Sequence, residues 1–341
     1  MPVTLKEVAE RAGVSRSAVS RTFTEGASVS ARTRGKVELA AAELGYAPSL
    51  LASGLTTGRT KLIGLVSNNF RNPVFLQIFD LFTRGLQDRG LRPLIVNIDD
   101  LSDPASAARR LRQHSVDGVI LASSSLSPAF AEAFRLAGVP VVHAFGRASG
   151  ETRVHVLGVD NHAIGRMAAR SLVRRGYRNV AFLGGPRAAT TTEDRLAGFA
   201  AVIARHPAVT MTVSFATDYA FEAGRSEMTR LLVDRPHAEA YFCGDDILAI
   251  GALSALRDAG LSVPGHVGVL GVNDMDMAGW PGIDLTTIRQ PIDAIIDASV
   301  ELAIAAAERP EHPPERRIFG CRLVERATLK PTVSGRPAGR G

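Results

Sequence analysis

Four polar side chains gather near the start of the chain: Arg16, Ser17, Ser20 and Arg21. If this stretch is helical, Ala18 and Val19 pack inward and these four side chains point elsewhere. The guanidinium of arginine can donate paired hydrogen bonds to the acceptor edge of guanine, and it also binds phosphate. The chemistry predicted for this stretch is therefore contact with DNA.

Two capped helices must position this face. Thr4 followed by Glu7 has the pattern of a capping box, and apolar residues recur at i, i+3, i+4 and i+7 from Leu5. Gly13 ends the first helix and Ser15 caps the second. This pattern predicts a helix-turn-helix, the unit that places a helix in the major groove. An ordinary surface helical hairpin is the alternative.

A third helix follows, capped by Ser30 and ended by Gly45. Three helices in so few residues make a small bundle with little core. We therefore expect residues 1–47 to form a DNA-binding headpiece.

The charge of the chain is concentrated in this segment. The whole sequence of 341 residues carries a net charge of +6, and residues 1–61 contain nine Lys or Arg against five Glu and no Asp. Phosphate contacts need positive charge at this place.

Composition excludes several classes of protein. The content of 45% hydrophobic and 22% charged residues is ordinary for a soluble globular protein. The chain has no signal peptide pattern and no apolar run long enough to span a membrane, so we expect a cytoplasmic protein without membrane contact. Cys243 and Cys321 lie outside any CxxC or Cys/His cluster, which predicts free thiols and no metal site.

From residue 62 onward, short apolar strands alternate with amphipathic helices. Such alternation predicts parallel sheets covered by helices on both faces, and the number of strands requires two similar α/β lobes. Ligands in such sheets bind at the carboxyl ends of the strands, here in the cleft between the lobes. The expected strands are 62–66, 94–98, 118–122, 139–145, 154–159, 180–184, 240–243 and 267–271.

The fold class predicted is thus α/β, with a three-helix headpiece and hinge before a two-lobed domain at 61–330. One lobe comprises about 61–158 with 289–318, and the other comprises 159–288 with 319–330. The hinge or linker covers 48–60, where Pro48 and Gly58 bracket a helix of only two turns. Residues 331–341 are rich in Gly, Pro and Arg, which predicts a disordered tail.

The order and spacing of several motifs resemble the LacI/GalR family of bacterial transcription regulators over roughly residues 3–330. The motifs that carry the resemblance are VTLKEVAERAGVS from Val3, VSR from Val19, LGYxP from Leu44, TGRT from Thr57, RLAGF from Arg195, DDxxAxG from Asp245 and LTTIRQ from Leu285. The resemblance implies a two-lobed, periplasmic-binding-protein-like effector domain of type I. It also implies a homodimer that reads a near-palindromic double-stranded DNA operator.

Roles for the headpiece and hinge follow from the same resemblance. Arg16, Ser17 and Arg21 match positions that face base edges, and Arg21 is the favoured base reader, although phosphate contact is the alternative. Leu55 matches the hinge position that enters the minor groove as an apolar wedge, with packing on the effector domain as the alternative. The full predicted set of DNA-contacting residues is Thr4, Ser15, Arg16, Ser17, Ser20, Arg21, Ser30 and Leu55.

The resemblance also implies an effector site in the cleft. Arg195 matches the effector-binding arginine, and Asp245 is expected to face the cleft while Asp246 caps the following helix. Arg147 with Arg195 would make the site attractive to an acid, so the effector is predicted to be a sugar or a sugar acid. The predicted effector-binding residues are Phe70, Asn72, Phe145, Arg147, Thr191, Arg195, Tyr219, Asp245, Asn273 and Ile292.

No catalytic motif is found. The GLTTGRT segment has one residue too few for a phosphate-binding loop, and no serine elbow, HExxH or GxGxxG after a strand occurs. We therefore predict a ligand-responsive repressor with no cofactor and no enzymatic activity. A solute-binding receptor without DNA function is the alternative, because the two lobes alone would fit it.

Overall fold

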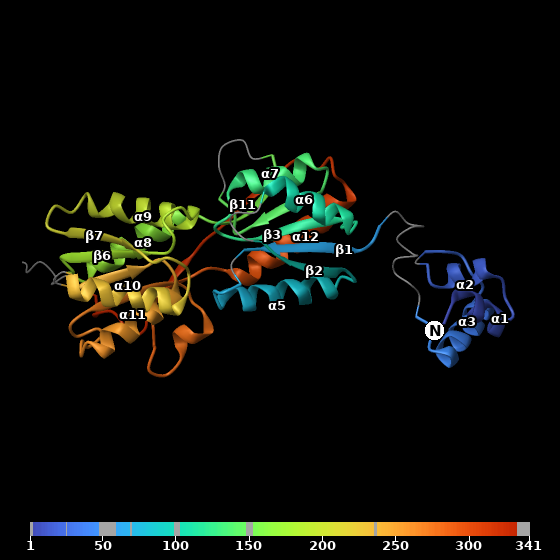
Figure 1. Ribbon diagram of the computed structural model, residues 1–341, viewed down its shortest axis with the longest axis horizontal. Helices are drawn as coiled ribbons and strands as arrows, with labels where there is room; N and C mark the ends of the chain where they lie inside the picture. The colour runs from blue at the N-terminus through green and yellow to red at the C-terminus, as the bar shows by residue number, and fades with distance from the viewer. Residues whose placement is uncertain are drawn as a thin grey trace, which may run out of the picture. The chain divides into compact units, whose positions relative to one another are not determined.

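A computed structural model describes residues 3–24, 26–47, 59–68, 70–98, 103–147, 153–234 and 237–332. The chain divides into two compact units, Met1–Leu62 and Ile63–Gly341 (Figure 1). The hinge residue Leu55 and most of the predicted tail lie outside the described residues.

The described residues of the first unit form a bundle of three helices, α1 (Leu5–Ala12), α2 (Arg16–Thr22) and α3 (Ala31–Leu44). The predicted capping box is present, since the Thr4 hydroxyl accepts from the Glu7 amide and the Glu7 carboxylate accepts from the Thr4 amide. Gly13 takes a left-handed backbone, with φ of 65°, and so turns the chain between α1 and α2. The small core comprises Val8, Ala9, Val19, Val37, Ala40 and Ala41.

The first lobe of the second unit is a six-stranded sheet in the order β11-β5-β4-β3-β1-β2. Helices cover both faces, with α5 (Val74–Gln87) and α12 (Ile292–Glu308) packed together and α6 (Pro104–Gln113) against α7 (Pro128–Leu136). The strands are β1 (Leu62–Ser67), β2 (Arg92–Asn97), β3 (Gly118–Ala122), β4 (Val141–Ala144), β5 (His155–Val159) and β11 (Arg316–Phe319).

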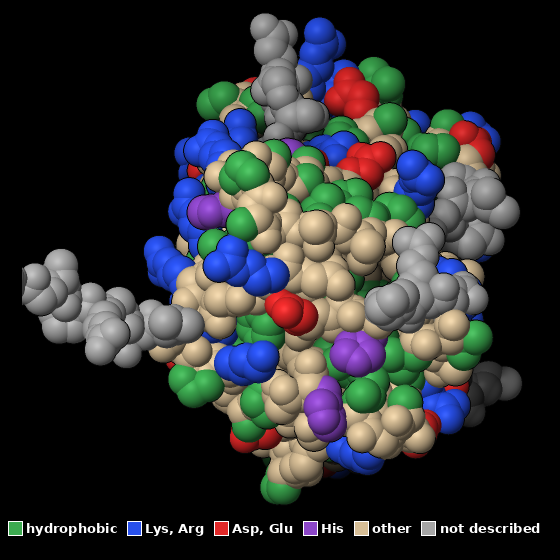
Figure 2. All heavy atoms as spheres, turned by 90° about the vertical axis from the view of Figure 1, so that its left-hand side faces the viewer, with side chains coloured by type: hydrophobic (Ala, Val, Ile, Leu, Met, Phe, Trp, Pro, Cys, Tyr) green, Lys and Arg blue, Asp and Glu red, His purple; other side chains and the backbone are tan. Residues whose placement is uncertain are grey.

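The second lobe repeats this plan in the order β12-β10-β9-β8-β6-β7. Helix α8 (Asn161–Arg174) packs on α9 (Thr190–Ile203), and α10 (Phe221–Asp234) packs on α11 (Asp246–Asp258). The strands are β6 (Asn179–Gly184), β7 (Thr210–Phe215), β8 (Ala240–Cys243), β9 (Gly268–Asn273), β10 (Thr287–Arg289) and β12 (Arg322–Val324). At the end of this lobe that faces the viewer in Figure 2, Lys and Arg side chains outnumber Asp and Glu along one side.

The predicted α/β class with two parallel-sheet lobes is confirmed, with one exception in strand direction. Strand β12 pairs antiparallel with β10, whereas the other pairs whose register is defined are parallel. Four strands were not expected: β7, β10, β11 and β12. The chain crosses between the lobes after β5, between β10 and α12, and between β11 and β12.

Helices α8 and α9 pack closely against each other at two glycines, Gly165 and Gly198. An added Cβ would lie 2.1 Å from the Arg195 carbonyl oxygen at Gly165, and 2.1 Å from the His162 carbonyl oxygen at Gly198. No larger residue fits at either place without moving the helices apart. This close crossing fixes the first turns of α9 against α8, and those turns carry the predicted effector residue Arg195.

Candidate DNA-binding face and effector cavity

The second helix of the headpiece presents the predicted polar face. Arg16, Ser17, Ser20 and Arg21 are all exposed on α2, while Val19 and Thr22 are buried beneath them. Within the described ranges, no carboxylate pairs with Arg16 or Arg21, whereas Arg11 of α1 forms an ion pair of 2.5 Å with Glu43. Both guanidinium groups are therefore available to an external acceptor.

Three other predicted DNA-contacting residues are the N-caps of the headpiece helices. The hydroxyls of Thr4, Ser15 and Ser30 accept from backbone amides of α1, α2 and α3 respectively. All three residues are also exposed, so their side chains lie at the surface of the bundle.

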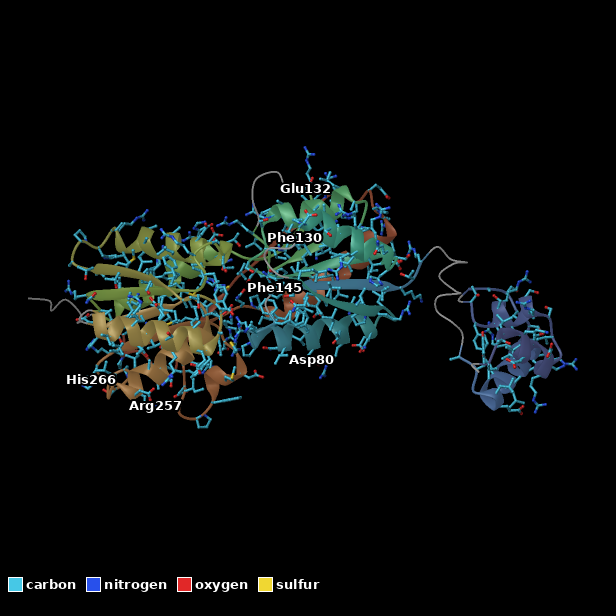
Figure 3. All side chains as sticks on the ribbon, in the orientation of Figure 1. Asp80, Phe130, Glu132, Phe145, Arg257 and His266 are labelled. Carbon is cyan, nitrogen blue, oxygen red and sulfur yellow. The ribbon has the colours of Figure 1, made fainter. Side chains whose placement is uncertain are left out.

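A cavity lies where the carboxyl ends of the strands of both lobes meet. Most of the predicted effector residues line it, with Phe70 and Arg147 as the exceptions. Phe145, which Figure 3 places at the end of the first lobe that faces the second, is one wall. The lining residues are Asn72, Val74, Phe75, Ile78, Ser124, Phe145, Thr191, Arg195, Tyr219, Asp245, Asn273, Gln290 and Ile292.

Asp245 is the central acceptor of this cavity. Its Oδ2 accepts from Asn72 Nδ2 of the first lobe at 2.8 Å and from Asn273 Nδ2 at 2.9 Å, while Oδ1 accepts from the Ile247 amide. Burial raises the pKa of Asp245, and the Ile247 amide, the Arg195 charge and the two side-chain amides oppose this rise. The carboxylate therefore joins the two lobes.

The prediction that Asp246 caps α11 is wrong. Asp245, not Asp246, is the N-cap of α11, and it faces the cavity at the same time. The Asp246 carboxylate is buried, where it accepts from the Met275 amide at 2.9 Å and the Thr287 hydroxyl at 2.5 Å. The two carboxylates have separate partners, because consecutive side chains at a strand end point in different directions.

Arg195 is the buried cation of the cavity. Its Nε donates to Asn161 Oδ1 of α8 at 2.8 Å, and its Nη1 donates to the Gly244 carbonyl at 2.5 Å. Only 4% of the residue is exposed. These bonds hold the guanidinium in one orientation beside Asp245. The positive charge of Arg195 balances the negative charge of Asp245 in the lining of the cavity.

Tyr219 closes one side of the cavity. Its hydroxyl bonds to the hydroxyls of Thr191 at 3.0 Å and Thr192 at 2.7 Å. A Cβ added at Gly185 would lie 2.4 Å from the ring, so the backbone of Gly185 lies directly against it. Burial raises the pKa of the Tyr219 phenol, which therefore stays neutral.

The backbone beneath Asn273 is unusual. Asn273 and the following Asp274 have φ of 118° and 60°, a region that residues with a side chain seldom adopt. The buried Asp274 carboxylate accepts from Arg289 of β10 and from Arg326. Gln290 donates to Asn273 Oδ1 at 2.6 Å and completes the setting of this amide.

Two predicted effector residues lie elsewhere. The Arg147 guanidinium crosses between the lobes to Asp194, with Nε–Oδ2 of 2.9 Å and Nη2–Oδ1 of 2.5 Å, and also reaches Glu193 at 3.0 Å. Two carboxylates thus neutralise the charge that was expected to attract an acid. Phe70 stacks on Phe79 with ring centroids 4.7 Å apart and does not line the cavity.

Sequence reasoning missed five lining residues: Val74, Phe75, Ile78, Ser124 and Gln290. Val74, Phe75 and Ile78 lie on the first turns of α5, where they read as ordinary core positions of an amphipathic helix. Gln290 follows β10 directly, and Ser124 lies two residues after the end of β3. The rule that ligands lie at strand ends could have found Ser124.

The model of bacterial regulatory proteins of the lacI family matches residues 4–49, and the model of a periplasmic binding protein-like domain matches residues 169–329. The HTH-type transcriptional repressor PurR of Escherichia coli O139:H28 is 30% identical over 332 residues, which cover 96% of each chain. PurR of Proteus mirabilis is 28% identical over 333 residues, again with 96% of each chain covered.

Solved structures agree. The lac repressor dimer bound to operator and the anti-inducer ONPF has a TM-score of 0.86 and 27% identity, covering 97% of this chain and 100% of that one. The complex of the transcriptional regulator CelR with cellobiose has a TM-score of 0.70 and 28% identity, covering 96% of this chain and 99% of that one. In the part of the chain that the structure describes, every helix is too short or too polar to cross a bilayer.

These relatives are repressors, so the chain is a regulator and not an enzyme. The helix-turn-helix headpiece, the two lobes and the full-length similarity agree. The chain belongs to the lacI family of bacterial regulatory proteins, as a DNA-binding transcriptional repressor with an effector domain.

Proposed function

We propose that the operator affinity of this repressor is changed by a neutral carbohydrate bound in the cavity between the lobes. The observation that carries this proposal is the balanced charge of the lining. Arg195 and Asp245 are its charged pair. The remaining polar groups are the side-chain amides of Asn72, Asn273 and Gln290 and the hydroxyls of Ser124, Thr191 and Tyr219. Such groups donate to and accept from sugar hydroxyls, while Phe75 and Phe145 offer apolar faces.

The lining of the cavity is less well suited to a sugar acid than to a neutral sugar. The second arginine that would have favoured an anion is Arg147, which is already bound to Asp194 and Glu193. The CelR structure, which holds cellobiose, supports the carbohydrate class. A melting-temperature screen of the full chain tests the proposal, because a ligand that binds the folded state raises stability. Neutral sugars should raise the midpoint, whereas aldonates or nucleobases that raise it in their place would refute the carbohydrate class.

On the DNA side, we propose that a homodimer places α2 of each headpiece in the major groove of a near-palindromic operator. Arg16 and Arg21 lie on the exposed face of α2 and have no carboxylate partner among the residues that the structure describes, which supports this role. If Arg21 reads guanine, Arg21→Ala should cost about 1–3 kcal/mol of discrimination between operator and non-operator DNA. If it contacts only phosphate, the variant should instead reduce the salt dependence of binding to any DNA sequence.

Leu55 remains the proposed minor-groove wedge of the hinge. Leu55→Ala should weaken operator binding and leave effector binding unchanged. Loss of effector binding in this variant would place Leu55 in the effector fold instead.

A further inference from the structure

Four arginines gather along helix α8 in the second lobe (Figure 1). Arg166, Arg170 and Arg174 are spaced four residues apart, so they lie on one face of the helix, about 6 Å from one turn to the next. Arg175 follows as the C-cap of the helix. Together with Glu325, which directly follows β12, these arginines line a hollow beside α8, which we name the basic hollow.

Two of the four arginines have carboxylate partners within the lobe. Arg166 donates to Asp160, the N-cap of α8, at 3.0 Å, and Arg175 donates to Glu325 at 2.5 Å. The Asp160 and Glu325 side chains are 46% and 63% exposed, so solvent screens both pairs. These two carboxylates neutralise at most half of the positive charge along the basic hollow.

The other two arginines, Arg170 and Arg174, carry the excess charge. Among the residues that the structure describes, neither has a carboxylate partner, and both are exposed. Arg174 lies in the last turn of α8, where the helix dipole stabilises a cation, but Arg170 lies one turn earlier, where the dipole contributes little. The basic hollow therefore presents two positive charges that the described part of the lobe leaves unpaired.

Arg175 is the buried member of the set. Only 4% of its side chain is exposed, and its Nη1 donates to the Ser171 carbonyl at 3.0 Å and to the Ser171 hydroxyl at 2.7 Å. Within the described structure, its Nε has no hydrogen-bond partner. A buried donor without an acceptor is unfavourable, and an oxyanion against this guanidinium would supply the acceptor. This donor is an observation independent of the charge excess, and it also indicates an anion.

The chemistry of the basic hollow differs from that of the effector cavity. In the effector cavity Arg195 and Asp245 balance each other, and the two linings share no residue. Guanidinium groups bind phosphoryl oxygens through paired, charge-assisted hydrogen bonds. A ligand with one negative charge would leave one of the two unpaired arginines uncompensated, whereas a chain of phosphoryl groups would neutralise both.

We propose that the basic hollow binds a small polyphosphate, such as pyrophosphate, tripolyphosphate or the phosphate chain of a nucleotide. Arg170 and Arg174 bind the phosphoryl groups from successive turns of α8, and Arg175 supplies a further donor from the buried side of the hollow. This site is separate from the effector cavity and does not depend on which effector binds there.

Isothermal titration of the full-length repressor with tripolyphosphate, in about 0.15 M salt, tests the proposal. Replacing both exposed arginines, by Arg170→Gln with Arg174→Gln, should raise the Kd at least about tenfold, because charge-assisted contacts are lost. The urea midpoint should stay the same, since both side chains are exposed. Inorganic phosphate, which carries less charge, should bind more weakly than tripolyphosphate.

Two matched double variants control for attraction of the anion to any basic surface. Arg110→Gln with Arg112→Gln removes two exposed arginines from α6 of the first lobe and should change the Kd by less than about twofold. Arg16→Gln with Arg21→Gln makes the same change on the DNA-binding face. Loss of tripolyphosphate binding in this last variant alone would assign the anion to the headpiece and overturn the proposal.

Duplex DNA distinguishes a small ligand from a nucleic acid as the source of the phosphates. In the Arg16→Gln, Arg21→Gln background, adding Arg170→Gln and Arg174→Gln should leave the binding of a random-sequence duplex unchanged. Weaker duplex binding with an unchanged Kd for tripolyphosphate would make the basic hollow a nucleic-acid surface and overturn the small ligand. An equal Kd for tripolyphosphate with and without Arg170 and Arg174, or no measurable binding to the unaltered chain, would also overturn it.

Discussion

The ion pair between Arg147 and Asp194 joins the two lobes, and its removal tests whether it holds them together. The perturbation is a double-mutant cycle of Arg147→Ala, Asp194→Ala and the double variant. The guanidinium makes two parallel hydrogen bonds to the carboxylate, and the side chains are 30% and 13% exposed. Such bidentate, charge-assisted pairs are stronger than single bonds between neutral groups.

The expected coupling energy between Arg147 and Asp194 lies between two limits. Fully exposed pairs couple by about 0.2–1 kcal/mol, and truncation of one partner of a fully buried pair costs about 3–5 kcal/mol. Because Arg147 keeps nearly a third of its surface in solvent, we expect a coupling energy of about 1.5 kcal/mol. Glu193 adds little, since its side chain is 53% exposed.

Urea unfolding of the four proteins, followed by far-ultraviolet circular dichroism, measures this coupling. The exposed pair Arg225–Asp258, whose atoms are 3.0 Å apart within the second lobe, is the matched control and should couple by less than about 1 kcal/mol. Since the effector cavity is built by both lobes, Arg147→Ala should also weaken effector binding by up to about tenfold. Additive effects of the two substitutions, within about 0.5 kcal/mol, would refute the idea that this pair holds the lobes together.

Three further perturbations address the headpiece, the second lobe and the first lobe. Thr4→Ala should lower the stability of the headpiece by about 1 kcal/mol, because the capping box is lost. The measurement is hydrogen exchange of the α1 amides, which should become faster. Unchanged exchange would contradict the assigned cap. Gly198→Ala should destabilise the chain by more than about 2 kcal/mol and impair effector binding, because the added Cβ meets the backbone of α8. Gly85→Ala in α5 is the control and should be tolerated, since the nearest atom to its added Cβ would be 3.6 Å away. Equal urea midpoints for the two variants would disprove this account. Burial lowers the pKa of His143 to about 4, so the folded state keeps this ring neutral while the unfolded chain takes up a proton below about pH 6.5. Stability should therefore fall by about 1.5 kcal/mol between pH 6.5 and pH 5 through this group, and His143→Gln should remove that part of the pH dependence.

Most helices of the fold are predictable from the sequence, because their apolar residues recur with helical period and their ends carry recognisable caps. The missed strands have weaker patterns. Strand β7 lies at the edge of its sheet and is largely exposed, so its residues do not form a buried apolar run. Strands β10 and β12 have three residues each, which is too short for any periodicity to show. Strand β11 begins with two arginines and alternates exposed with half-buried residues, so it lacks the buried apolar run that identified β8, a strand of the same length.

The cavity is predictable where a residue lies at or just after the end of a strand and belongs to a recognisable motif, as for Asn273 at the end of β9 and Asp245 two residues after β8. Arg147 was misplaced because a long side chain near a strand end takes its direction from its partners. Its partners, Asp194 and Glu193, are distant in sequence and belong to the other lobe. Local patterning cannot reveal such a pair, and the same holds for the stacking of Phe70 on Phe79.

The left-handed backbone at Asn273 and Asp274 has a consequence for how this site can diversify. Arg289 and Arg326 fix the Asp274 carboxylate from outside the cavity, so the course of the chain here does not depend on the side chain at position 273. The Asn273 side chain itself accepts from Gln290 and donates to Asp245, so a residue that replaces it changes the hydrogen bonding of Asp245 while Asp274 keeps its own partners. A substitution such as Asn273→Asp would replace this donor with a second carboxylate beside Asp245, so the altered cavity would favour a ligand that donates hydrogen bonds between the two acids.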